Sequence, residues 1–221
     1  MNAEPSPSPR LRDGARVALP LAPGPFFFGL SFGVFAEAAG FSSAAAVVMS
    51  ATSFAGSAQF AAASVLDAGG TVVAAIAAAV FLNARYAAMS VTVASIVPGG
   101  RLRRFLASQL IVDEAWALSG RSGRFQWPIL AGAGLLLYAF WVTSTALGTV
   151  VGGLLGDPNA LGLDAAFAAL FLALAFPYLR ERRALQAAAL AAAITLVLTP
   201  VSPAGVPIVA ASTACLLGLK R

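Results

Sequence analysis

Long apolar stretches separated by short polar segments occupy most of the 221-residue chain. A membrane hydrocarbon core of about 30 Å requires roughly 20 apolar residues in a helix. The pattern predicts an all-α, polytopic integral membrane bundle with about 7–8 membrane elements. We expect these elements at 17–38, 43–66, 71–97, 127–155, 164–179, 184–199 and 205–219, with a weaker one at 105–120.

The first sixteen residues differ from the rest of the chain because they are rich in proline, serine and charge. Segments of this composition bury too little apolar surface to fold. We therefore expect residues 1–16 to be a disordered cytoplasmic tail. Residues 17–221 are expected to form a single transmembrane transport domain.

Helix-breaking residues are concentrated in the first membrane element, at Pro23, Gly24, Pro25 and Gly29. A proline inside a helix removes a backbone hydrogen bond and clashes with the preceding turn. Within a bilayer, the freed groups are tolerated only where protein or water satisfies them. The sequence therefore predicts a broken first helix, which in transporters often borders a binding site. A helix that simply begins after Pro25 would explain the same residues.

The composition is that of a membrane protein. Hydrophobic residues make up 59% of the chain and charged residues only 10%, whereas soluble domains carry about 25% charged residues. The net charge of +5 comes largely from short arginine clusters at the ends of apolar stretches. Contacts with lipid headgroups explain such clusters, so we expect the chain to contact the bilayer and to bind no nucleic acid.

Several chemistries are excluded by residues that the sequence lacks. There is no histidine, hence no HExxH zinc site and no imidazole to carry protons. The phosphate loop GxxxxGK(S/T) is also absent. We expect no enzymatic activity, no catalytic residues, no metal and no cofactor. Any proton relay would use a carboxylate, a tyrosine or water.

The arginine clusters also orient the chain, because cytoplasmic loops are enriched in Lys and Arg. Arginines at 10–16 and 121–124 are expected in the cytoplasm, but the cluster at 101–104 creates a conflict. If the first three elements all span the membrane, this cluster lies outside and 105–120 must cross as an additional element. If one early segment is re-entrant, every arginine from 101 to 124 is cytoplasmic. We favour the crossing, which satisfies every cluster except one.

Arg85 is the single charge in the apolar stretch 71–97. A guanidinium near the bilayer centre costs at least about 2.5–3.5 kcal/mol, so it usually faces a protein interior or a wet cavity and has a partner. Its planar fork can hold a carboxylate through two parallel hydrogen bonds. Arg85 is therefore a candidate to bind the α-carboxylate of an amino acid. The alternative is a purely structural ion pair.

Other polar side chains interrupt the apolar stretches. Asn83 and Tyr86 flank Arg85, and Gln59 is the bulkiest polar residue of the second element. On a continuous helix, residues three and four apart share a face. One such face would comprise Ser53, Gly56, Ser57 and Phe60. Alternatively, these small residues serve helix packing, with the serines bonded to backbone carbonyls.

Two adjacent carboxylates, Asp113 and Glu114, lie within the weaker element. One could pair with Arg85, and the other could hold a substrate ammonium or take a coupling proton. Desolvation raises the pKa of a carboxyl group, which would allow it to titrate near neutral pH. Alternatively, both acids are exposed at the membrane interface beside the arginines at 101–104.

At these residues the chain resembles a known family. The run at 25–33 (PFFFGLSFG), the stretch at 50–61 (SATSFAGSAQFA), the Asn-x-Arg-Tyr motif at 83–86 and the acidic pair at 113–114 are similar to the azaleucine-resistance AzlC family. Members of this family are large subunits of bacterial branched-chain amino acid exporters. The likeness is strongest over 20–120 and beyond 126 is mainly one of hydropathy.

The resemblance implies a multi-pass permease of the bacterial cytoplasmic (inner) membrane that exports branched-chain or similar hydrophobic amino acids. It also implies an ion gradient as the driving force, with protons as the expected coupling ion, and a small AzlD-type membrane subunit as partner. The characteristic polar positions correspond to Gln59, Asn83, Arg85, Asp113 and Glu114. Two alternatives stay open: a non-transporting membrane assembly or regulatory subunit, and a permease for another small zwitterion.

Overall fold

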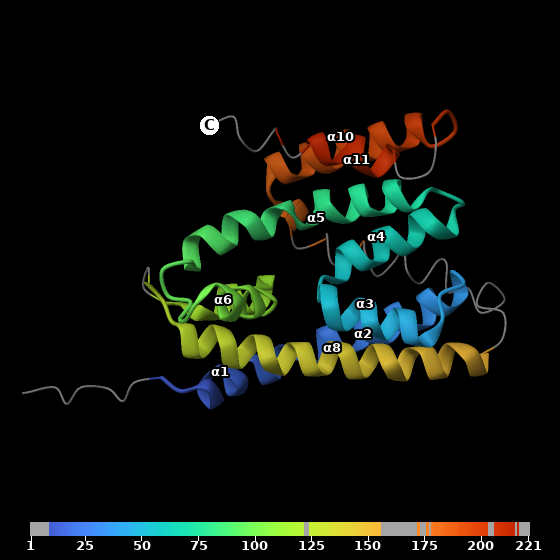
Figure 1. Ribbon diagram of the computed structural model, residues 1–221. Helices are drawn as coiled ribbons and strands as arrows, with labels where there is room; N and C mark the ends of the chain where they lie inside the picture. Colours follow the sequence, from blue (N-terminus) through green and yellow to red (C-terminus); the bar gives the residue numbers. More distant parts are fainter. Residues whose placement is uncertain are drawn as a thin grey trace, which may run out of the picture.

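The computed structural model describes residues 9–121, 124–155, 172, 176, 178–202, 206–214 and 216. Most of these residues are helical, as the sequence predicts, and the long helices run along one common direction (Figure 1). The helices are α1 (Leu11–Ala18), η1 (Leu19–Leu21), α2 (Pro23–Ala38), α3 (Ser43–Ser53), α4 (Gly56–Asp67), α5 (Val72–Val93), α6 (Arg101–Ser108), α7 (Asp113–Ser119), α8 (Trp127–Leu155), η3 (Tyr178–Arg180), α10 (Arg182–Leu198) and α11 (Val206–Ser212). Two short strands, β1 (Gly120–Arg121) and β2 (Arg124–Phe125), form an antiparallel pair before α8.

Within the described part of the chain, α5 and α8 are the helices long and apolar enough to cross a membrane. The bent pair formed by residues 11–21 and 23–38 adds a third crossing if it is one span. The chain is therefore a helical membrane protein with two or three candidate spans, and the larger number of elements stays a prediction. The elements predicted at 164–179 and 205–219 lie in part outside the described residues.

The first predicted element is bent, with an angle of 68° between its two helical parts. The bend falls at Ala22, immediately before Pro23. Pro23 begins α2, a position where the missing N–H would have no intrahelical partner in any case. We expected Gly29 to contribute to the break, but it lies inside the continuous helix α2 and is buried.

Glycines allow the backbones of α2 and α8 to touch. A Cβ atom added at Gly33 would overlap the backbone carbonyl of Thr145, and one added at Gly148 would overlap the backbone carbonyl of Leu30. Lipid tails give helices no hydrophobic reason to associate, so close contact between backbones is a main source of association in membranes. The α2–α8 pair is therefore the tightly packed base of the bundle.

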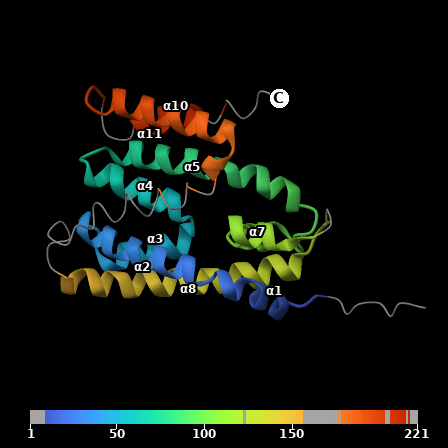
Figure 2. The same ribbon diagram turned by 180° about the vertical axis from the view of Figure 1, so that it is seen from behind.

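The prediction that 43–66 crosses the membrane as one element is wrong. Phe54 and Ala55 divide this segment into α3 and α4. In both views α3 runs inward from one end of the molecule and α4 returns to that same end (Figures 1 and 2). We call this pair the α3–α4 hairpin. Phe54 and Ala55 at its tip are buried, as irregular backbone at membrane depth must be.

The crossing that we favoured for 105–120 is wrong as well. The segment is divided between the short helices α6 and α7, and residues 109–112 are not helical. α5 ends and α8 begins at one end of the molecule, and α6 and α7 lie between them near that end (Figures 1 and 2). This α6–α7 hairpin enters from the end opposite to the α3–α4 hairpin.

The two hairpins remove the charge conflict. The arginines of α1, α6 and β2 all lie toward the end where α1 and α8 begin (Figure 1). We call this the arginine-rich end, and the positive-inside rule predicts that it is cytoplasmic. The alternative of a re-entrant early segment therefore accounts for the arginines of α1, α6 and β2.

The expectation of a disordered tail over 1–16 is wrong for its second half. Residues 1–8 lie outside the described residues, but the chain is helical from Leu11 in α1. The Asp13 carboxylate accepts the backbone N–H of Arg10 at 2.8 Å, which caps the helix. Gly14 and Gly132 let the backbones of α1 and α8 approach closely, so tertiary packing offsets the polar composition.

Candidate functional site

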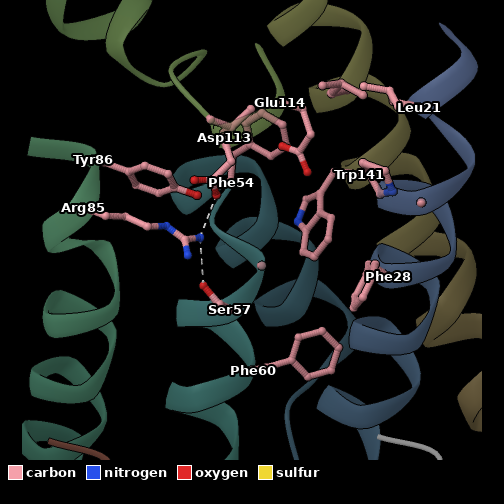
Figure 3. Close-up of a pocket in the computed structure, with 15 residues that line it drawn as sticks. Leu21, Phe28, Phe54, Ser57, Phe60, Arg85, Tyr86, Asp113, Glu114 and Trp141 are labelled. Carbon is pink, nitrogen blue, oxygen red and sulfur yellow. Dashed lines mark hydrogen bonds and ion pairs between the residues drawn. The ribbon is translucent and has the colours of Figure 1, made fainter. Parts of the chain in front are cut away.

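The α5 helix and the tips of both hairpins surround a cavity of about 470 Å³ (Figure 3). Its lining includes the predicted site residues Arg85, Tyr86, Asp113 and Glu114, together with Gly24 and Pro25 of the predicted helix break. We call it the charged cavity. The broken helices explain how these side chains meet, since α7 begins at Asp113 and α4 begins at Gly56, which also lines the cavity.

Arg85 has the partner that its position in an apolar helix requires. Its Nη2 lies 2.8 Å from Oδ2 of Asp113 and 3.4 Å from Oγ of Ser57. The guanidinium carbon lies 5.2 Å from the centroid of the Tyr86 ring, within cation–π distance. The side chains of Arg85 and Asp113 are each 47% exposed in the protein alone, so the pair is accessible from the cavity.

Glu114 is the second acid of the charged cavity. Its side chain is half-buried, and it forms no ion pair with a basic residue in the part of the chain that the structure describes. Figure 3 shows its carboxyl group directed into the space between α7 and Trp141. A carboxylate that is partly desolvated and lacks a cation can bind a positively charged group of a ligand.

The opposite wall of the charged cavity is apolar. Phe28 of α2, Phe60 of α4, and Leu137 and Trp141 of α8 contribute to it. Phe60, Leu137 and Trp141 are almost fully buried, so this wall is rigidly packed from behind. One side of the cavity thus offers charges and the other offers a surface for an aliphatic or aromatic group, as is typical of small-molecule sites.

We expected Gln59 to belong to the site, but it is not among the described residues that line the charged cavity. It is fully buried, and its Oε1 accepts the Ala55 N–H at 3.2 Å and the Trp141 Nε1–H at 3.1 Å. Its Nε2 donates to Ser50 Oγ at 2.9 Å. Gln59 therefore accepts a hydrogen bond from a backbone N–H that the helix break leaves without a helical partner, and it links the α3–α4 hairpin to α8. Its role is structural.

Phe54 makes the turn between α3 and α4 in a left-handed conformation, with φ of 36° and ψ of 52°. This conformation costs roughly 1–2 kcal/mol for a residue with a Cβ, and glycine usually occupies it at helix ends. The Phe54 ring packs edge-on against Tyr138 at a centroid distance of 5.3 Å. Burial of the ring offsets the backbone strain at this hairpin tip.

A second, smaller cavity of about 260 Å³ lies beside the first and contains Asn83. We call it the polar cavity, after the polar residues that line it: Ser53, Asn83, Tyr86, Ser90, Ser108 and Gln109. The predicted face formed by residues 53, 56, 57 and 60 is confirmed for Gly56, Ser57 and Phe60, which all line the charged cavity. It is wrong for Ser53, because the break at Phe54 directs this residue into the polar cavity.

Two further residues of the site escaped sequence analysis. Trp141 lies in a uniformly apolar helix where nothing marks it, yet it lines the charged cavity and holds Gln59. Phe54 carries none of the Gly, Pro or Asn signals of a turn. Gly56, two residues later, is the one residue near the turn whose type indicates a helix break.

A cavity that brings acidic and basic side chains together at interrupted helices inside a membrane bundle is the kind of site that secondary transporters use. Comparison with known proteins supports a membrane protein of transporter type. The chain belongs to the AzlC family, because residues 20–155 match the family described as "AzlC protein". Over 213 residues it is 32% identical to an "Uncharacterized membrane protein" of Archaeoglobus fulgidus, covering 95% of this chain and 94% of that protein. No solved structure matches the chain.

Proposed function

We propose that the protein is a secondary permease that exports branched-chain or similar hydrophobic amino acids through the charged cavity. The observation that carries this proposal is the pairing of Arg85 with Asp113 opposite an apolar wall, with the second acid, Glu114, left without a basic partner among the described residues. Binding of a small zwitterion requires both a positive and a negative group within a few ångströms of each other, and an apolar wall selects an apolar side chain.

The roles of the charged residues follow from their contacts. Arg85 has five N–H donors and uses one nitrogen for both Asp113 and Ser57, so donors are left for a substrate carboxylate. The sequence left open which of the two acids pairs with Arg85, and Asp113 makes that ion pair. Glu114 is therefore the better ammonium ligand, and Phe28, Phe60 and Trp141 would contact the side chain of the substrate.

The setting of this transport is part of the same proposal. An ion gradient, with protons as the coupling ion, would drive export, because the sequence has no nucleotide-binding loop. An AzlD-type small membrane subunit would complete the permease in the bacterial cytoplasmic membrane. Large apolar side chains exposed on α5, such as Val73, Val80 and Val91, offer a surface for lipid or for this subunit.

The test is counterflow of labelled leucine in proteoliposomes that contain the protein together with its candidate partner subunit. We expect uptake of leucine and valine, and little uptake of lysine or glutamate. Arg85→Ala should abolish counterflow, whereas Arg101→Ala, which removes an exposed arginine of α6, should preserve it. Absence of leucine counterflow in a well-inserted wild-type protein, or normal counterflow in Arg85→Ala, would contradict the proposal.

A further inference from the structure

The polar cavity follows one face of α5. Asn83, Tyr86, Ala87 and Ser90 all line it, and residues spaced by three, four and seven positions share a face of a helix. At 1.5 Å per residue, the seven steps from Asn83 to Ser90 cover about 10 Å along the helix axis. α5 runs from its start at Val72 toward the arginine-rich end (Figure 1), so the cavity extends from the middle of the molecule toward that end.

The lining of the polar cavity suits water. Hydroxyl and amide groups of Ser53, Asn83, Ser90, Ser108 and Gln109 contribute to it, and none of its lining residues is acidic or basic. Within the described residues, Oδ1 of Asn83 is a buried side-chain oxygen without a hydrogen-bond partner. A buried acceptor left unpaired is costly, and ordered water is the usual partner in a polar cavity with room for it.

The two cavities share a wall. Phe54, Tyr86 and Val112 line both of them, and Val112 directly precedes Asp113. Figure 3 shows the hydroxyl group of Tyr86 directed toward Asp113. The titratable residues that line the two cavities are Arg85, Tyr86, Asp113 and Glu114. The polar cavity thus ends next to Asp113 and Glu114, the acids among the described residues that line the two cavities.

We propose that the polar cavity is a hydrated route by which a coupling proton passes between the carboxyl groups of Asp113 and Glu114 and the arginine-rich, cytoplasmic end of α5. This inference rests on the proposed transport function. The O–H bond of a protonated carboxyl breaks, the proton joins a water molecule beside Tyr86, and successive water molecules pass a proton on until one leaves as hydronium. No electron transfer and no other reactant are involved.

The first test measures whether the route contains water. The test compares two single-cysteine variants, Ser90→Cys and Val91→Cys, in a protein whose Cys215 is replaced by Ser. Both are studied in membrane vesicles as the complex with the partner subunit. Ser90 lines the polar cavity, whereas its neighbour Val91 is 77% exposed on the outer face of α5. A charged methanethiosulfonate reagent applied from the cytoplasmic side should modify Ser90→Cys at least about tenfold faster, because a thiol among apolar groups does not ionise.

The second test separates proton movement from substrate binding. Counterflow exchanges one amino acid for another and needs no proton release, whereas net export driven by a pH gradient does. Ser90→Leu, which fills the route, should retain leucine counterflow and lose net export. Val91→Leu should retain both.

Equal modification rates for Ser90→Cys and Val91→Cys would overturn the proposal, as would normal net export in Ser90→Leu. Export that follows a sodium gradient and ignores the pH gradient would overturn it too. Failure of the transport function would be recognised separately, as loss of counterflow in the wild-type complex. The modification rates do not depend on which solute is carried.

Discussion

Nη2 of Arg85 lies 2.8 Å from Oδ2 of Asp113 and joins the middle of the spanning helix α5 to the tip of the α6–α7 hairpin. A substrate carboxylate that binds the free donors of the guanidinium would weaken the attraction of Arg85 to Asp113. Binding can therefore loosen the contact between a fixed helix and a re-entrant tip. A local change of this kind is one way in which a ligand shifts a transporter between conformations.

The guanidinium fork should matter beyond its charge. Arg85→Lys keeps the charge but removes the planar pair of donors. We expect leucine export to persist with a KM raised about 10–100-fold, because a hydrogen bond to a charged group contributes about 1.5–3 kcal/mol. Initial rates of labelled leucine export measure this, with Arg101→Lys as the control. An unchanged KM would mean that the fork of Arg85 does not contact the substrate.

Glu114 should determine whether the ligand needs an ammonium group. We expect wild-type counterflow to be inhibited more strongly by leucine than by 4-methylpentanoate, which has the same carbon chain without the amine. In Glu114→Gln this preference should shrink by about tenfold or more, since a charge-assisted hydrogen bond is lost. Glu37→Gln, at the end of α2, should keep the wild-type preference. If both variants keep it, another group binds the ammonium.

Gln59 should act on stability. Gln59→Leu leaves the Ala55 N–H without this acceptor in a buried place, whereas the Trp141 Nε1–H keeps Ser50 Oγ at 3.2 Å. A buried donor without a partner costs about 1–3 kcal/mol, so the free energy of unfolding should fall markedly. Thermal unfolding of the purified protein in detergent measures the loss. Gln186→Leu, on an exposed position of α10, should have little effect, and equal behaviour of the two variants would contradict a structural role for Gln59.

Contact between the α2 and α8 backbones leaves no room for a methyl group. In Gly33→Ala the new Cβ would meet the backbone of Thr145, which cannot move away without separating the helices. Overpacking of this kind typically costs about 1–3 kcal/mol. Gly100→Ala is the matched control because nothing lies within 4 Å of its added Cβ. Thermal unfolding of both variants measures the loss of stability. A Gly33→Ala protein as stable as the control would contradict the close packing of α2 against α8.

Hydropathy predicted the helical class and the candidate spans α5 and α8, and the prolines and glycines of the first element predicted the bend before α2. It could not predict the hairpins, because a re-entrant segment is as apolar as a spanning one. The residue that turns the α3–α4 hairpin is Phe54, whose left-handed backbone is stabilised by tertiary contacts with Tyr138 and Trp141. Local sequence carries no sign of such contacts.

The charged residues of the site were more predictable than its polar ones. An arginine in an apolar helix demands a partner, which made the Arg85–Asp113 pair one of the expected arrangements. Gln59 and Asn83 have several ways to satisfy their hydrogen bonds, and only the positions of their neighbours decide among them. Asn83 lines the polar cavity and Gln59 binds the backbone of Ala55, although both looked equally suited to a substrate.

Protection of the charged cavity by substrate tests the central claim most directly. Ser57 lines this cavity next to Arg85, and Ser57→Cys in a protein with Cys215 replaced by Ser gives a single reactive thiol. In proteoliposomes with the partner subunit, saturating leucine should slow modification of this thiol by a small methanethiosulfonate reagent, and lysine should not. A rate that leucine leaves unchanged, in a preparation that carries out leucine counterflow, would show that the amino acid crosses elsewhere.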